Sequence, residues 1–246
     1  MVPFVMSSPA PFHVFGQSHQ AVLLTTVLVI LMMAVFRSRR KGLALIAERL
    51  LGISLLLTWP VTTYGHWAGG TLSYDNMLPC HFCDIASVSG GIAMLTRNRL
   101  ACEILYFFGM AGTLQGLLTP NLKFDYPDAR FFAFFLIHSG VVIAAVHAVT
   151  SMACPPRPGA VSRMLLITAV YGVTAGGINA ALGVNYGFLC RKPEVASLMN
   201  HLGPWPWYIA SLLGLCVIFY TVLNLPFLLW RSLSQARSKQ PDGMDK

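Results

Sequence analysis

The amino-acid sequence predicts an all-α fold: a polytopic membrane bundle of about seven transmembrane helices, with the N-terminus outside and the C-terminus in the cytoplasm. Of its 246 residues, 55% are hydrophobic and only 11% are charged. Soluble domains carry roughly 25% charged residues, so this composition indicates an integral membrane protein. Two further observations support the prediction: a series of apolar runs long enough to cross a bilayer, and an uneven distribution of Lys and Arg between them.

The apolar runs follow one another with short connections. A membrane-spanning helix needs about 20 mostly apolar residues, and each run approaches that length. In chain order, the predicted helices cover residues 20–36, 43–63, 78–96, 100–118, 131–150, 164–182 and 207–230.

The first three predicted helices are distinguished by the polar residues at their ends. The first contains no charge and is followed by Arg37. The second contains Glu48 and Arg49 close to its basic end, where both side chains can snorkel to the interface. The third begins at Leu78, so that "CHFCD" (80–84) occupies its first turns.

The other four predicted helices also place polar groups near one end. The fourth contains Glu103 and reaches the opposite side near Gln115. The fifth begins with "FFAFFLIHSG" (131–140), which puts His138 about 10 Å below its start. The sixth carries a stripe of glycines that is typical of close helix packing, and "HLGPWPWY" (201–208) opens the seventh.

The connecting segments on one side of the bundle carry most of the positive charge. Twelve basic residues fall on that side: Arg37, Arg39, Arg40, Lys41, Arg97, Arg99, Arg157, Arg163, Arg231, Arg237, Lys239 and Lys246. Four fall on the other side: Lys123, Arg130, Arg191 and Lys192. Cytoplasmic loops are the ones enriched in Lys and Arg, which gives the predicted orientation.

The net charge of +8 follows from this topology. It favours contact with anionic lipids at the cytoplasmic face rather than with nucleic acid. Residues 1–230 are expected to form a single membrane domain and residues 231–246 a basic, polar cytoplasmic tail. Residues 1–16 lack the basic n-region of a signal peptide. The sequence leaves the oligomeric state open.

Polar side chains from six of the seven predicted helices fall at one outer level of the bundle. In the third helix, Cys80, Cys83 and Asp84 lie within about 100° of one another on a polar front, with His81 at its margin. A polar front on a membrane helix is expected to face the bundle interior or a water-filled cavity. The other candidates at this level are His19, Gln115, His138, Asn179, Asn185, Tyr186, His201, Trp205 and Trp207.

Each candidate also has an ordinary structural interpretation. A buried Cys often behaves as a small hydrophobe, and an intramembrane Asp or His can form a structural pair, such as Asp84 with His81. Gln and Asn in membrane helices commonly hydrogen-bond between helices. Trp205 and Trp207 fit an interfacial aromatic belt.

Three classes of function are compatible with these residues. A thiol becomes a nucleophile when a nearby imidazole takes its proton, so Cys80 or Cys83 with His138 favours acyl chemistry on a lipid ester. The "CHFC" motif also suits a membrane thiol oxidoreductase, although the outer loops offer only Cys190 for a second pair. A small-solute transporter or channel is the third class. A metal site is not expected, because Cys80, His81 and Cys83 do not all point one way.

Several motifs, in this order, resemble the bacterial YwaF-type integral membrane proteins, whose family includes the eukaryotic transmembrane protein 164. The motifs are "FGQSH", "LPCHFCDIA", "QGLLTPNL", "FFLIHSG", "NYGFLCRKP" and "GPWPWY". The resemblance extends over nearly the whole chain. It implies a seven-helix membrane fold, distantly like the androgen-induced membrane hydrolases, and a location in the bacterial cytoplasmic (inner) membrane.

The resemblance also implies an activity. The eukaryotic branch is a cysteine-dependent acyltransferase that moves fatty acyl chains between phospholipids. Its Pro-Cys-His motif matches Pro79-Cys80-His81, and its essential His in an aromatic helix matches His138. The bacterial pattern is closer to "LPLHLC", with the cysteine at position 83.

We therefore expect a membrane-embedded acyltransferase or acyl hydrolase that acts on a phospholipid or lysophospholipid through a thioester. Cys80 would be the nucleophile, His138 the general base and acid, and Cys83 the reserve nucleophile, with no metal or organic cofactor. The residues expected to support the reaction or bind substrate are His81, Asp84, Gln115, Asn179, Asn185, Tyr186, His201, Trp205 and Trp207.

Overall fold

The computed structural model describes residues 10–68, 70–193 and 198–238. Within these ranges the chain is all-helical, without strands, and seven segments are long and apolar enough to cross a membrane. The predicted all-α fold with seven spans is therefore confirmed. The spans are Gln17–Arg39, Lys41–Trp67, Tyr74–Thr96, Arg99–Leu118, Ala129–Thr150, Ala160–Leu182 and Trp207–Ala236.

Some spans consist of more than one helical element. The elements are α1 (Gln17–Arg39), α2 (Lys41–Ala68), α3 (Tyr74–Met77), α4 (Phe82–Thr96), α5 (Arg99–Phe108), the π-helical turn η1 (Gly109–Thr113), α6 (Leu114–Leu118), α7 (Ala129–Thr150), α8 (Ala160–Leu182), the 3₁₀ turns η2 (Tyr186–Phe188) and η3 (Leu198–His201), and α9 (Trp207–Ser238). The fourth span is thus α5, η1 and α6 in succession.

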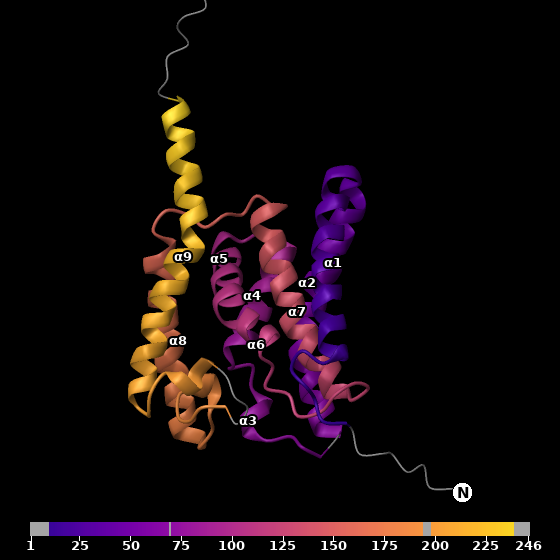
Figure 1. Cartoon of the computed structure of the whole chain (residues 1–246), viewed down its shortest axis with the longest axis vertical. Helices are drawn as coiled ribbons and strands as arrows, with labels where there is room; N and C mark the ends of the chain where they lie inside the picture. Colours follow the sequence, from indigo (N-terminus) through magenta and orange to yellow (C-terminus); the bar gives the residue numbers. More distant parts are fainter. Residues whose placement is uncertain (1–9, 69, 194–197, 239–246) are drawn as a thin grey trace, which may run out of the picture.

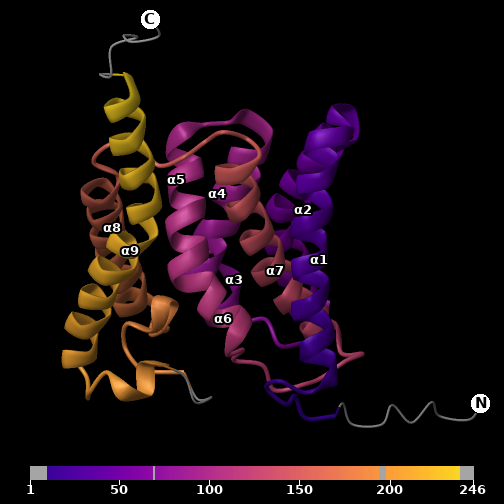
Figure 2. The ribbon, with the colours of Figure 1, turned by 45° about the horizontal axis from the view of Figure 1, so that its top comes forward.

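Helix α7 lies at the centre of the bundle, where it packs against α1, α2, α4 and the α5–α6 span. Helix α4 packs between α2 and α5, and α8 and α9 form a pair at one side (Figures 1 and 2). The main apolar core joins Leu55 of α2, Leu105 of α5 and Val141 of α7, all nearly inaccessible to solvent. The α8–α9 pair contacts this core more sparsely than the other helices do.

Glycines allow α2 and α4 to approach closely. A Cβ at Gly91 would lie 2.9 Å from the carbonyl oxygen of Gly52 and 2.4 Å from Cγ of Leu56. Small residues at such crossings let membrane helices pack backbone to backbone. This contact fixes α4, which carries the cysteine motif at its N-terminus.

The predicted third helix, 78–96, is not continuous. Helix α3 ends at Met77, Leu78 is extended at φ −96° and ψ 144°, and α4 begins at Phe82. Pro79 explains the break, because a proline disfavours helical geometry in the preceding residue. Cys80 and His81 therefore lie in a non-helical segment, and their predicted place on a helical polar front was wrong.

The last helix is longer than the predicted span 207–230. Helix α9 continues to Ser238, so the first residues of the predicted tail, 231–246, are helical. Residues 239–246 lie outside the described part of the chain.

The end of the bundle at which α4, α7 and α9 terminate and α5 and α8 begin is here called the basic end. The carboxylate of Glu48 is buried there, 3% exposed, and pairs with Arg97 at 2.8 Å and with Nε2 of His147 at 3.2 Å. The expectation that Glu48 snorkels was therefore wrong. A carboxylate in a membrane helix needs a partner, and α4 and α7 supply two.

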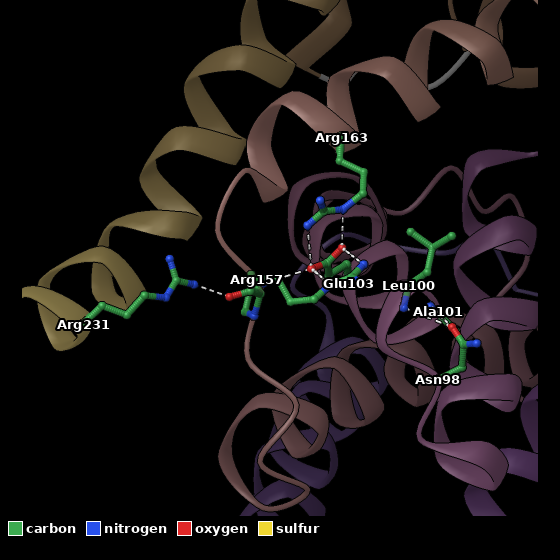
Figure 3. A network of polar contacts seen from close by, with 8 residues as sticks. Asn98, Leu100, Ala101, Glu103, Arg157, Arg163 and Arg231 are labelled. Carbon is green, nitrogen blue, oxygen red and sulfur yellow. Dashed lines mark hydrogen bonds and ion pairs between the residues drawn. The ribbon is translucent and has the colours of Figure 1, made fainter. Parts of the chain in front are cut away.

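The second acidic group of the basic end, Glu103, ties α8 to the core. Its side chain is 1% exposed and accepts five hydrogen bonds of 2.8–3.0 Å from Arg157 and Arg163. Figure 3 shows the two guanidinium groups meeting at this one carboxylate. Arg231 of α9 donates to the carbonyl of Pro156, beside Arg157. The cluster therefore joins α5, α8 and α9.

Replacing Glu103 with Gln tests this anchor. Gln removes the charge that both arginines share while keeping the shape, so the free energy of unfolding should fall by about 2–3 kcal/mol. The measurement is thermal unfolding of the purified protein in detergent, with an expected decrease of the midpoint by about 5–10 °C.

Asp125→Asn is the matched control, because the Asp125 side chain accepts from the adjacent N–H of Tyr126 and Asn keeps that acceptor. A Glu103→Gln protein that unfolds at the wild-type temperature would show that the cluster does not anchor α8.

Candidate functional site

The cysteine motif lies at the N-terminus of α4, at the end of the bundle opposite the basic end. The backbone N–H of His81 donates to Oδ2 of Asp84 at 2.9 Å. Asp84, the third residue of α4, thus caps the N-terminus of its own helix, as a carboxylate at this position often does. In the described chain, the N–H groups of Phe82 and Cys83 have no backbone acceptor. Free donors in a first helical turn favour nearby negative charge.

Tyrosine hydroxyls hold the non-helical segment that contains Cys80. The buried hydroxyl of Tyr186 accepts from the N–H of Leu78 at 3.1 Å and donates to the carbonyl of Tyr74. Burial raises the pKa of Tyr186, which keeps this donor protonated. Tyr171 of α8 donates to the carbonyl of Cys80 at 3.0 Å. Helix α8 and the loop after it therefore fix the backbone at Cys80.

Two asparagines order that loop. Asn179 exchanges two hydrogen bonds with the backbone of Tyr186, at 2.7 and 2.9 Å. Oδ1 of Asn185 accepts from the N–H groups of Cys190 and Arg191. Both amides are thus occupied with backbone partners. The structure brings Asn179, Asn185 and Tyr186 together with the Cys80 segment, where they act as its support.

His138 is buried within α7, 8% exposed. Its Nδ1 lies 2.7 Å from the carbonyl oxygen of Phe134, and its ring stacks on that phenylalanine with centroids 3.9 Å apart. A carbonyl only accepts, so Nδ1 carries the hydrogen. In the neutral ring, Nε2 is therefore the nitrogen with a free lone pair, as a general base requires.

Two glycines of the fourth span bring His138 towards the start of α4. A Cβ at Gly116 would lie 2.7 Å from Nε2 of His138, and a Cβ at Gly112 would lie 2.5 Å from the ring of Phe82. Gly112 and Gly116 are one helical turn apart, so about 6 Å separates them. The Phe82 ring and the His138 ring thus lie against adjacent turns of one segment. Phe82 immediately precedes Cys83 and is two residues from Cys80.

The two cysteines face different surroundings. Cys80 packs with Tyr171 and Tyr186 in the cluster beside α8, whereas Cys83 packs against the main core, which also contains Ile137. Both are free thiols. In the part of the chain that the structure describes, neither thiol hydrogen-bonds to the His138 ring, whose one such bond is to the Phe134 carbonyl.

The His81 ring packs against the loop that follows α8. Its ring centroid is 5.1 Å from that of Tyr186, and its Nε2 is 3.4 Å from the carbonyl oxygen of Asp75. Gln115 precedes Gly116, is half-buried, and its side-chain amide makes no hydrogen bond within the described residues.

The other predicted residues lie outside this arrangement. His201 is exposed in η3, Trp205 donates to the carbonyl of Leu189 at 3.2 Å, and Trp207 is 71% exposed. The two tryptophans occupy the positions expected for an interfacial aromatic belt. His19 connects α1 to α6, since its Nε2 lies 2.9 Å from the carbonyl oxygen of Leu117.

A groove between α1 and α7 was not anticipated from the sequence. Its volume is about 600 Å³, and its walls are mostly apolar. Thr26 of α1 and Ser139 of α7 hydrogen-bond within it at 2.9 Å. The hydroxyl of Ser18 is buried and has no hydrogen-bond partner among the described residues. Two features of the sequence indicate these contacts. Ser18, Thr25 and Thr26 give α1 a hydroxyl-rich face, which lines the groove. Gly112 and Gly116, on either side of Thr113, leave room for the Phe82 and His138 rings.

Comparison with known proteins gives two matches. The sequence pattern of the TMEM164 family matches residues 14–224. An uncharacterized protein of Treponema pallidum (strain Nichols) is 29% identical over 231 residues, which cover 87% of each chain. No solved structure matches the chain significantly. The YwaF-type resemblance stays a prediction from the motifs.

Removing one hydroxyl tests the support of the Cys80 segment. Tyr186→Phe deletes the bonds to Tyr74 and Leu78 but keeps the ring, so the segment should open more often. We expect Cys80 to react several-fold faster with a water-soluble maleimide, consistent with loss of about 1–2 kcal/mol of hydrogen bonding.

Cys80 reactivity is best measured in a background in which Cys190, the exposed thiol, is replaced by Ser. Tyr126→Phe is the control, since Tyr126 is 61% exposed. Equal Cys80 reactivity in the Tyr186 and Tyr126 variants would contradict the proposed support.

Proposed function

Because the chain belongs to the TMEM164 family of membrane proteins, we propose that it is a cysteine-dependent enzyme that transfers or hydrolyses phospholipid acyl chains. The observation that carries the proposal is the approach of His138 and the start of α4 to adjacent turns of η1 and α6. This arrangement supports a thiol and an imidazole acting on one substrate. The family resemblance of the Pro-Cys-His motif and the aromatic helix is consistent with it.

In the proposed reaction, Nε2 of His138 removes the thiol proton and the sulfur attacks the ester carbonyl of a phospholipid. The N–H groups of Phe82 and Cys83, which have no backbone acceptor within the described residues, supply donors for the oxyanion together with the amide of Gln115. Collapse of the tetrahedral intermediate breaks the ester C–O bond, and the imidazolium protonates the departing lysophospholipid. A cysteine thioester is left.

The second step regenerates the thiol. His138 takes a proton from a lysophospholipid hydroxyl or from water, and the resulting oxygen nucleophile attacks the thioester. Collapse of this second tetrahedral intermediate breaks the C–S bond and releases the new ester or the free fatty acid, and the imidazolium returns the proton to the sulfur. Transfer and hydrolysis differ only in this acceptor.

Cys80 is the first choice of nucleophile. It lies in the non-helical segment just before α4, outside the first helical turn, and it is the cysteine of the Pro79-Cys80-His81 motif. Cys83 is fixed in the first helical turn against the main core. It remains the reserve nucleophile. Asp84 contributes by fixing the start of α4, and His81, whose backbone N–H donates to Asp84, is the residue that precedes this helix.

A lipid substrate is supported by the groove between α1 and α7. Its lining runs from Gln17 to Val29 on α1, a rise of about 18 Å. This is close to half of the roughly 30 Å hydrocarbon thickness of a bilayer, which suits one acyl chain. The Lys and Arg distribution supports an orientation in the bacterial inner membrane that places the cysteine end at the outer leaflet.

Acyl trapping tests the nucleophile. The protein in liposomes is incubated with a phospholipid that carries an alkyne-tagged acyl chain, and hydroxylamine-sensitive label on the chain is measured. Wild type should be labelled, Cys80→Ala should lose the label, and His138→Asn should be labelled at least about 100-fold more slowly. Cys83→Ala should keep most of the label.

Cys190→Ser is the matched control, because this exposed thiol lies at the same end of the bundle. Loss of label with Cys83→Ala alone would reassign the nucleophile. Undiminished label in the Cys80→Ala/Cys83→Ala double variant would refute the thioester mechanism.

A methyl group at Gly116 tests the position of His138. The added Cβ meets Nε2 and Cδ2 at 2.7 Å, so the ring must move. We expect Gly116→Ala to lower the labelling rate at least about tenfold, since small misplacements of a catalytic group are costly. The control is Gly172→Ala, whose Cβ meets nothing within 4 Å. Equal labelling rates in both variants would place His138 outside the reaction.

A further inference from the structure

The arginine cluster around Glu103 holds more positive than negative charge. Arg157, Arg163 and Arg231 supply three guanidinium groups against the single carboxylate of Glu103, which leaves an excess of two. Within the described ranges, the other acidic residue of the basic end is Glu48, and it is already paired with Arg97 and His147. The excess is therefore not neutralised by the described protein.

The three guanidinium groups are held in place by fixed partners. Arg157 and Arg163 each use Nε and one terminal nitrogen on Glu103. Arg231 uses one terminal nitrogen on the carbonyl of Pro156. Figure 3 shows the Arg157 and Arg163 side chains converging on Glu103, with Arg231 pointing towards the Arg157 segment from α9. An arginine that is already positioned loses little freedom when it binds a further anion.

Part of each guanidinium group remains accessible. The side chains of Arg157 and Arg163 are 43% and 32% exposed, and Arg231 is half-buried. Trp230, next to Arg231, is 61% exposed. Tryptophan marks the headgroup level of a membrane helix. The first turn of α8, which begins at Ala160, adds the positive end of a 23-residue helix.

We propose that this cluster is a binding site for the phosphodiester of an anionic phospholipid. Two phosphate oxygens match the paired N–H groups of a guanidinium, and basic pockets between helices at a membrane surface are typical anionic-lipid sites. The lipid bridges Arg231 of α9 to Arg157 and Arg163, which reinforces the sparse packing of the α8–α9 pair on the core. This site is independent of the thioester chemistry at the opposite end.

The test measures lipid binding to the full-length protein in detergent by native mass spectrometry, with phosphatidylglycerol and phosphatidylcholine of identical chains. Wild type should bind phosphatidylglycerol preferentially. Arg231→Gln should weaken that binding about fivefold or more, since one basic group near a membrane contributes about 1 kcal/mol, and should leave phosphatidylcholine binding unchanged. Arg231→Lys should recover part of the loss.

Arg39→Gln is the matched control, because it removes one charge from the same end but on α1, away from the cluster. Equal weakening by Arg39→Gln would show attraction to general surface charge and overturn the proposal. An unchanged preference in Arg231→Gln would do the same. Displacement of the lipid by millimolar inorganic phosphate would overturn the assignment to a lipid.

Thermal unfolding separates binding from folding. Arg231→Gln and wild type should unfold at similar temperatures in phosphatidylcholine, and only wild type should be stabilised by added phosphatidylglycerol. If the Gln variant does not fold, stabilisation by phosphatidylglycerol is compared between Arg231→Lys and wild type, and the Lys variant should be stabilised less. Acyl labelling at the cysteine end should persist in these variants, so a negative lipid result leaves the proposed reaction standing.

Discussion

Polar groups in the hydrocarbon core of a membrane have no water to bond with, so they must find partners within the protein. This constraint sorts the titratable residues of the chain to the two ends of its bundle. At the basic end, Glu48 and Glu103 are saturated by arginines and a histidine, and these pairs join five helices. At the opposite end, which carries Cys80 and Cys83, polar side chains bond to backbone groups instead. Asp84 accepts from the N–H of His81 at the start of α4, and Asn179 bonds to the backbone of Tyr186 in the loop after α8.

The two ends therefore differ in what their polar groups are free to do. The carboxylate of Glu103 is fully occupied with arginines. By contrast, Nε2 of His138 and the amide of Gln115 lack such partners within the described chain. A rigid, saturated end and an opposite end with unoccupied donors and acceptors suit an enzyme whose substrate completes the site. At the basic end, the exposed parts of Arg157 and Arg163 could likewise be completed by an anionic lipid headgroup, as proposed above.

Close packing at glycines places these free groups. The His138 ring packs against Gly116 of α6, and the Phe82 ring packs against Gly112 of η1. The π-helical turn that contains Gly112 widens the fourth span at this point, as π-turns often do at functional sites. The position of His138 relative to the cysteines thus depends on how the rings of α7 and α4 pack against glycines of η1 and α6.

Hydropathy and charge alone predict the helical class, the seven spans and the segregation of basic residues, because membrane insertion depends on local composition. The candidate residues of the third and fifth spans also follow from the motifs. Other features depend on contacts between segments far apart in the chain. Pro79 and the Asp84 cap break the third span, Glu48 is buried because Arg97 and His147 reach it, and the two cysteines face different clusters. Such partners are chosen by packing, which no local pattern encodes.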